Sequence, residues 1–143
     1  MRLTQFTDYA LRLLIFSAMH SDRLVTIEEA AAAYGISRSH LMKVANHLTR
    51  DGFLKSVRGR AGGLGLARPA KAIGLGAVVR STEPDFAIVE CFGADDSCRI
   101  TPSCRLRGIL ADAMQAFLAE IDRHNLADLV VDPALFGIER PAA

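Results

Sequence analysis

Two short helices joined by a glycine turn constrain the fold of this chain most strongly. Thr26 is a typical N-cap residue, and the acidic side chains of Glu28 and Glu29 suit the positive end of the helix that follows. Gly35 favours the end of that helix, and Ser37 favours the start of the next one. The sequence therefore predicts a helix-turn-helix.

The second of these helices has one apolar face and one polar, basic face. The apolar side chains recur at helical spacing and are Leu41, Val44, Ala45 and Leu48. The N-cap region and the opposite face carry side chains that suit base edges and phosphates: Ser37, Arg38, Ser39, His40, Lys43, Asn46 and Arg50. An exposed basic helix after a short turn is typical of a recognition helix, and its first residues, Ser39 and His40, are the better candidates for base contact.

A hairpin is expected after this helix. Residues 53–57 predict a strand, residues 58–63 supply turn chemistry, and residues 64–68 predict the returning strand before a proline ends the pairing. Its glycines would allow a close approach to the DNA backbone, while Arg58 and Arg60 would reach phosphates or a minor groove. A nucleotide-binding loop is disfavoured because no GK[ST] motif follows the glycines.

The charge distribution supports a polyanion-binding surface in the same region. The net charge of the chain is +1. Residues 36–71 nevertheless hold eight Lys or Arg against one acid, or +7, whereas residues 1–35 sum to −1 and the remainder to −5. A solvated face usually mixes its signs, so this block favours nucleic acid as the partner.

The size and the first helix define the broad class. With 143 residues, we expect one compact unit with two functional parts, mainly α-helical with a small β-wing. The opening segment carries Asp8 and Arg12 among apolar residues, which predicts an amphipathic helix rather than a signal peptide. No apolar run approaches the length of a membrane span, so we expect a cytoplasmic protein.

The second half of the chain predicts a short helical or linker segment over 73–82 and a long helix over about 105–124. The long helix has a narrow apolar stripe formed by Leu106, Leu110, Ala113, Phe117 and Ile121. The stripe could pack on the chain's own core, but dimerisation is favoured because a symmetric operator needs a two-fold protein. The expected parts are a DNA-binding domain over 1–82, a cluster-binding loop over 83–104, a dimerisation helix and C-terminal segment over 105–131, and a weakly ordered tail over 132–143.

Cys91, Cys98 and Cys104 are the only cysteines of the chain and fall within one short polar segment. Their spacing is wider than that of zinc knuckles, and the segment has no fourth cysteine or histidine. An iron-sulfur cluster tolerates such irregular loops, and a cubane needs one protein ligand per iron. A cluster is therefore the favoured interpretation. A cofactor-free thiol switch, zinc or inert cysteines remain alternatives.

Several motifs in order resemble the IscR-type family of winged-helix regulators, and within it the NsrR-type nitric-oxide-sensing branch. These motifs are FTDYALRLL, ISRSHLMKVANHLTRDGFLKSVRGRAGGLGLARP, IGLGAVVRSTE and the three-cysteine loop, and together they cover about residues 1–130. The resemblance implies a homodimer with one 4Fe-4S cluster per subunit, 2Fe-2S being less expected. It also implies a repressor that binds a palindromic operator and releases it when nitric oxide attacks the cluster.

The resemblance also implies a fourth cluster ligand. Asp8 matches an aspartate that the branch donates across the dimer, whereas Arg107 occupies the place of the histidine ligand of the IscR branch. The wing departs from the family at Ala61 and Gly65, where polar or larger residues are usual. A sensor of iron supply or redox state with the same ligands is the alternative function.

Two further classes fit the residues less well. A redox enzyme or electron carrier would not need the basic helix-and-wing segment, and operator binding would discriminate against it. A constitutive, zinc-stabilised DNA-binding module would be colourless, and metal analysis would identify it.

Overall fold

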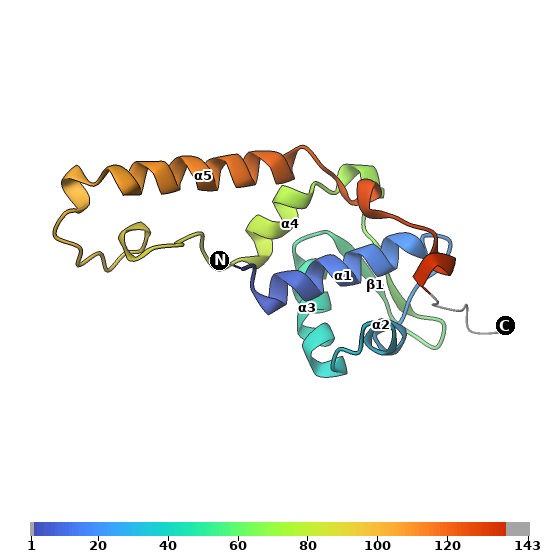
Figure 1. The fold of residues 1–143 in the computed structure, drawn as a ribbon. Coiled ribbons are helices and arrows are strands. Elements are labelled where there is room, and N and C mark those ends of the chain that lie inside the picture. Colours follow the sequence, from blue (N-terminus) through green and yellow to red (C-terminus); the bar gives the residue numbers. More distant parts are fainter. Residues whose placement is uncertain (1, 137–143) are drawn as a thin grey trace.

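The helix predicted at the start of the chain lies at the centre of the structure. The computed structural model describes residues 2–136 (Figure 1). Its α-helices and strands are α1 (Gln5–Met19), α2 (Ile27–Tyr34), α3 (Arg38–Arg50), β1 (Leu54–Val57), β2 (Gly63–Leu66), α4 (Leu75–Thr82) and α5 (Arg105–Asp122). Short 3-10 turns are η1 (Ala70–Ala72), η2 (Glu90–Phe92), η3 (Thr101–Ser103), η4 (Leu126–Leu129) and η5 (Pro133–Phe136). A mainly helical fold with a small β-wing is thus confirmed.

One face of α1 forms the middle of the hydrophobic core. Ala10, Leu13 and Leu14 are fully buried, and Phe16 is 2% exposed. This face packs against α3, α4 and β2, so these elements are positioned by their contact with α1. Burying each large apolar side chain contributes about 1.5–3 kcal/mol, so the buried face of α1 stabilises this part of the chain.

The predicted helix caps are present. Thr26 and Glu29 form a reciprocal capping box at the start of α2, with nitrogen-to-oxygen distances of 2.7 and 3.1 Å. Gly35 ends α2 in the left-handed region, at φ 62°, which glycine adopts without a steric penalty. The hydroxyl of Ser37 accepts a hydrogen bond from the backbone of His40 at the start of α3. The turn between the two helices is therefore specified locally.

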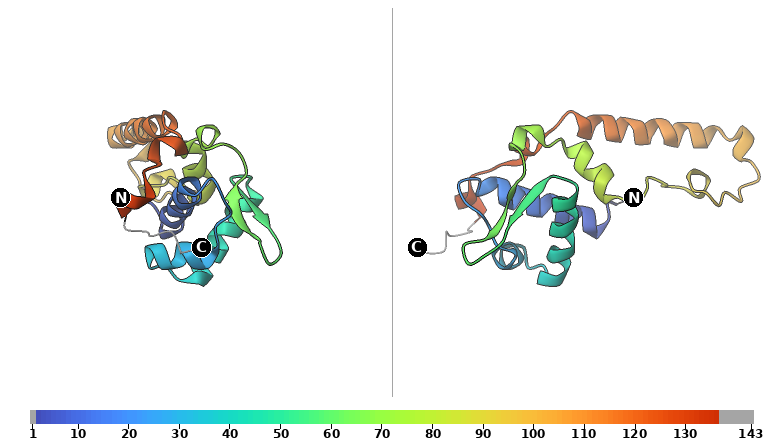
Figure 2. Two further views of the ribbon diagram at one scale, coloured as in Figure 1. Left: turned by 90° about the vertical axis from the view of Figure 1, so that its right-hand side faces the viewer. Right: turned by 180° about the vertical axis from the view of Figure 1, so that it is seen from behind.

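The wing is a two-stranded antiparallel hairpin in which Leu54 pairs with Leu66. Its strands lie within one or two residues of the predicted bounds, and Val25 adds a bridge to Leu64 that the sequence did not predict. A Cβ on Gly62 would lie 2.2 Å from the carbonyl oxygen of Val57. This glycine therefore admits the chain's own backbone at the turn of the hairpin. Figure 2 shows the hairpin projecting at the edge of the body.

The long helix α5 and the segment before it form an arm that extends from the body (Figures 1 and 2). The face of α5 that contacts the rest of the chain holds Met114 and Leu118, which are 8% exposed each. The stripe expected from the sequence is not buried as a unit, because Leu106 and Ala113 are exposed.

The chain returns to the body after α5. Leu126 is fully buried, and its backbone N–H donates to the carbonyl of Ile73. The tail expected to be weakly ordered begins with the turn η5, and residues 137–143 lie outside the described residues.

A bidentate ion pair joins α4 to the end of α5. The guanidinium of Arg80 donates to both carboxylate oxygens of Asp122, at 2.5 and 2.7 Å, and these hydrogen bonds hold the pKa of Asp122 below its ordinary value. Gly76 leaves the space for this pair, because a Cβ there would lie 1.8 Å from Oδ1 of Asp122.

We predict that Gly76→Ala and Asp122→Ala have non-additive effects on stability. Alanine at position 76 gains about 1 kcal/mol of helix propensity but displaces the ion pair, and only the second effect disappears when Asp122 is already alanine. Gly76→Ala should therefore be less favourable in the wild type than in the Asp122→Ala background. Urea unfolding of the four proteins measures this difference, and additive free energies would contradict the prediction.

Candidate functional site

The predicted recognition helix, α3, presents its polar face to solvent. Of the nine side chains proposed for DNA contact, the seven at the N-cap of α3 and along it are all exposed, namely Ser37, Arg38, Ser39, His40, Lys43, Asn46 and Arg50. The opposite face is buried against the core, with Leu41 and Leu48 fully inaccessible. Helical periodicity places Ser39, Lys43, Asn46 and Arg50 on one exposed face, as a helix that enters a major groove requires.

Two of the cations on this surface have partners within the chain. Nε of Arg38 lies 2.5 Å from Oε1 of Glu28 on α2, and this hydrogen bond lowers the pKa of the Glu28 carboxyl. The guanidinium of Arg50 contacts Asp51 at 3.3 Å and Nδ1 of His47 at 2.7 Å. Lys43 has no ion pair within the described residues 2–136. A phosphate can therefore approach Lys43 without displacing a carboxylate.

His47 does not belong to the DNA-facing surface, although its sequence position places it beside that face. Its side chain is half-buried, and Nε2 lies 2.9 Å from the backbone oxygen of Ser81 and 3.0 Å from its hydroxyl oxygen. The hydroxyl of Ser81 donates to Asp51 at 2.6 Å, which lowers the pKa of Asp51. This junction of His47, Asp51 and Ser81 fastens the end of α3 to the end of α4.

The wing carries two further cations that the sequence proposes for DNA contact. Arg58 and Arg60 are exposed in the turn between β1 and β2, and neither has an ion pair within the part of the chain that the structure describes. The hairpin contacts α3 through β1, so its position relative to the recognition helix is set by packing. A helix in one groove and a basic hairpin beside it is an arrangement suited to duplex DNA.

The three cysteines lie on the irregular part of the arm between α4 and α5. Cys91 is in η2, Cys98 lies in the loop that follows, and Cys104 is the N-cap residue of α5. All three thiols are free; Cys98 is exposed, and the other two are half-buried. The backbone over 93–104 is irregular, with only the short turn η3 inside it.

Two acidic side chains, which the sequence did not predict to be functional, hold this loop by hydrogen bonds. Glu90 accepts hydrogen bonds from both the backbone and the hydroxyl of Ser97, which lower the pKa of Glu90. Asp96 accepts from the backbone of Cys98 at 3.0 Å. The sequence shows that this segment is polar, but which side chains form hydrogen bonds with one another depends on the backbone conformation of the loop.

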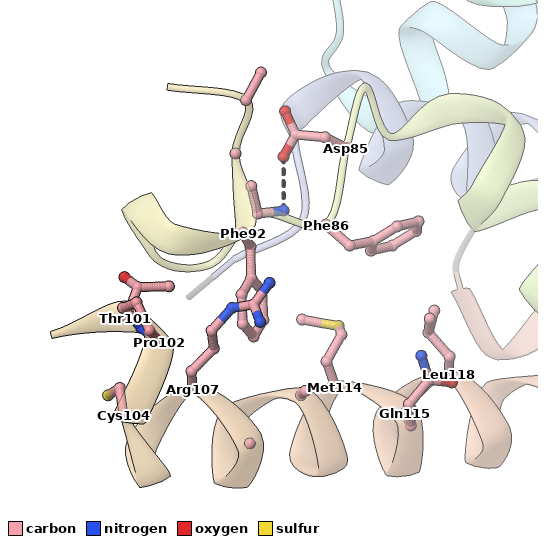
Figure 3. A pocket seen from close by; sticks show the side chains of 15 residues that line it. Asp85, Phe86, Phe92, Thr101, Pro102, Cys104, Arg107, Met114, Gln115 and Leu118 are labelled. Carbon is pink, nitrogen blue, oxygen red and sulfur yellow. Dashed lines mark hydrogen bonds between the residues drawn. The ribbon is translucent and has the colours of Figure 1, made fainter. Parts of the chain in front are cut away.

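A hollow of about 890 Å³ lies between this loop and α5 (Figure 3). Figure 3 shows Phe92, Arg107 and Met114 facing it, with Cys104 at one end and Leu118 at the other. Nε of Arg107 donates to the backbone oxygen of Cys91 at 3.4 Å. Only one of the three cysteines lines the hollow, so it is not a ready-made chamber for a cluster.

Asp8 is held on the body rather than on the arm. Its carboxylate forms an ion pair with Arg12 one helical turn along α1, at 2.8 Å. Within residues 2–136, no three His, Cys, Asp or Glu side chains of one chain are grouped as a metal site. The structure thus leaves the role of Asp8 as a cluster ligand a proposal.

These features define the class of protein: a winged helix-turn-helix DNA-binding regulator. The chain belongs to the Rrf2 family, because the family model described as an iron-dependent transcriptional regulator matches residues 3–132. Members of this family are transcription regulators that bind DNA and are typically dimeric, and they are not enzymes.

Solved structures with this fold include CymR, the global cysteine regulator of B. subtilis, at 24% identity and a TM-score of 0.69, covering 90% of this chain and 95% of that one. The T. potens IscR is 22% identical, with a TM-score of 0.71 and coverage of 90% and 85%. The oxidised form of Staphylococcus aureus CymR is 23% identical, with a TM-score of 0.70 and coverage of 88% and 93%. At these identities the likeness shows the fold. Among the described residues, no helix is both long and apolar enough to cross a bilayer.

We predict that Glu28→Gln strengthens binding to duplex DNA. The substitution removes the carboxylate that pairs with Arg38 and frees that guanidinium for a phosphate, so affinity should rise about tenfold and the salt dependence should steepen. Fluorescence anisotropy with a mixed-sequence duplex at several salt concentrations measures both quantities. Glu120→Gln, on the exposed end of α5, is the matched control, and an equal gain from it would attribute the effect to net charge alone.

Proposed function

We propose that this protein is a homodimeric repressor whose affinity for a palindromic operator is controlled by an iron-sulfur cluster that senses nitric oxide. Cys91, Cys98 and Cys104 of one subunit, with the partner subunit's Asp8, would hold a 4Fe-4S cluster. The two α3 helices would read the half-sites, and the wings would contact the backbone or minor groove. A cytoplasmic location is part of this proposal.

One observation carries the proposal: the cysteine segment begins where the DNA-binding elements are tied together. Glu83 ends α4, and its carboxylate accepts hydrogen bonds from the backbone and hydroxyl of Thr4, at 2.8 and 3.0 Å. Two residues earlier, Ser81 is bonded to His47 of α3. A rearrangement of the segment after Glu83 can therefore shift the start of α1, the end of α3 and the end of α4 at the same time.

The donor set fits a cluster in its chemistry. Three free thiols lie on an irregular segment that no long helix or strand separates, so the backbone can bring them around one group. Arg99, Arg105 and Arg107 place positive charge next to the cysteines and would offset the negative charge of thiolates. Iron in the cluster, when bound, would supply the reaction with nitric oxide.

Residues of this chain would couple the state of the cluster to the position of the recognition helices. Asp8 lies on α1, whose buried face packs against α3. A ligand set that includes the partner subunit's Asp8 would join the cysteine segment of one subunit to α1 of the other. It would restrain the separation of the two recognition helices, which must match the spacing of successive major grooves.

Regulation by thiol oxidation is the second candidate. Cys98 is exposed, and similar folds include a protein described as a global cysteine regulator and another in an oxidised form. In this case two of the three thiols would form a disulfide without any cofactor, by exchange with an external disulfide that is reduced to two thiols. A sensor of iron supply or general redox state, with the same cluster ligands, is the alternative within the cluster class.

We predict that protein purified without oxygen is brown and contains about four iron and four sulfide per chain. Nitric oxide should bleach its absorption and weaken operator binding in proportion to the fraction of cluster lost. Operator binding that is insensitive to nitric oxide but lost with iron chelation would favour the iron-supply alternative. Colourless protein whose DNA binding responds only to disulfide formation would favour the thiol switch.

We further predict that Leu106→Glu combined with Ile109→Glu converts the dimer into a monomer. These side chains are 58% and 62% exposed on α5, and charges there would oppose burial against a second copy. Sedimentation velocity measures the change, and circular dichroism checks the fold. Asp112→Lys, on the same helix, is the control for altered charge. A stable double-variant dimer would exclude this part of α5 from the interface.

A further inference from the structure

A small cleft lies beside the recognition helix, where the start of α1 meets α3. Its volume is about 190 Å³. The residues that line it are Gln5, Phe6, Tyr9, His40, Lys43 and Val44. No carboxylate is among them. The cleft is too small for a nucleotide base with its sugar, but one phosphate group has a suitable size.

Hydrogen-bond donors on the rim of this cleft lack acceptors. The hydroxyl oxygen of Tyr9 accepts a hydrogen bond from Nε2 of Gln5 at 2.8 Å, which leaves its own O–H to donate elsewhere. Within residues 2–136 no acceptor takes that proton, and neither the ammonium of Lys43 nor the ring of His40 has a side-chain hydrogen-bond partner. The cleft therefore offers three unused donors, one of them fully charged.

The two helices that form the cleft are packed against each other. Val44 is 1% exposed in the core, and Phe6 contacts the ring of His47 edge-on, with 5.3 Å between ring centroids. His47 is in turn bonded to Ser81. The ring centroids of Tyr9 and His40 are 6.3 Å apart, and both rings line the same cleft.

The geometry points to a seat for one backbone phosphate of the operator, held by Tyr9 and Lys43 with Gln5 as a positioning residue. This inference rests on α3 being the recognition helix. The cleft is lined by His40 and Lys43 of α3, so a duplex whose major groove holds α3 brings its sugar-phosphate backbone close to the cleft. A phosphate contact there would fix the register of α3 on the duplex without reading a base.

The test compares Tyr9→Phe with wild type as intact dimeric protein, in the form that binds DNA. The probe is the duplex that wild type selects from a random pool, made as a series in which single phosphates are replaced by neutral methylphosphonate. Tyr9→Phe should weaken binding about tenfold and leave the salt dependence unchanged, because it removes a hydrogen bond but no charge. Lys43→Met should weaken binding and reduce the salt slope by about one per subunit.

The methylphosphonate series identifies the contact itself. At one phosphate in each half-site, neutralisation should weaken wild type but have little further effect on Tyr9→Phe. The control is Tyr34→Phe, which alters the chain's other tyrosine; that ring packs against Phe16 and Arg12 on the inner side of α2. It should bind every probe as wild type does.

The outcomes separate failure of this inference from failure of the proposed function. If Tyr9→Phe binds like wild type while Lys43→Met does not, α3 still contacts DNA but the cleft holds no phosphate, and the inference is overturned. A loss in Tyr9→Phe that is equal at all phosphates, or that accompanies loss of dimerisation, would also overturn it. If neither variant changes binding, the assignment of α3 as the recognition helix is wrong.

Discussion

The burial of α1 is the constraint on which the rest of the structure depends. Its apolar face, centred on the fully buried Leu13 and Leu14, is the surface against which the recognition helix, α4 and the wing are packed. Each such side chain contributes about 1.5–3 kcal/mol, so the three elements cannot leave α1 independently at small cost. Two sets of hydrogen bonds add to this packing and hold the elements in one relative orientation. Glu83 holds the start of α1, and Ser81 holds the end of α3 through His47. Because both links come from the end of α4, the segment that carries the cysteines starts at the point where the DNA-binding elements are joined.

The basic surface contains cations of two kinds. Arg38 and Arg50 are already bound to carboxylates of the chain, whereas Lys43 and the wing arginines have no ion pair within residues 2–136. A surface ion pair contributes little to stability in water. Its main effect here is that it must break before the arginine can bind a phosphate of DNA, and this lowers the net gain from the phosphate contact. Arg38 and Arg50 should therefore contribute less to non-specific DNA binding than cations that have no partner within the described residues. The unpartnered ones, with the donors of the Tyr9 cleft, define where the backbone of the duplex should lie.

The arm has the opposite character, because much of its apolar surface has no covering element in one chain. Ile100, Leu106 and Ile109 are each more than half exposed, and a hollow separates the cysteine loop from α5. Apolar side chains gathered in this way usually mark an interface. The loop itself is held by short-range hydrogen bonds from Glu90 and Asp96 rather than by a core. Such a segment can change its path at modest cost, which a ligand-responsive region requires.

The sequence by itself determined the local elements of this protein. Caps at Thr26 and Ser37, the glycine turn, helical periodicity and the hairpin turn act over a few residues, and the corresponding helices and strands lie within a residue or two of their predicted bounds. The tertiary structure alone decided which side chains from distant segments meet. Thr4 and Glu83 are 79 positions apart, and His47 and Ser81 are 34 apart, so neither pair leaves a periodic pattern. The same holds for the cleft of Gln5, Tyr9 and Lys43 and for the face of α5 that packs on the body. These contacts depend on how helices cross, and that is set by the packing of whole surfaces rather than by any local run of residues.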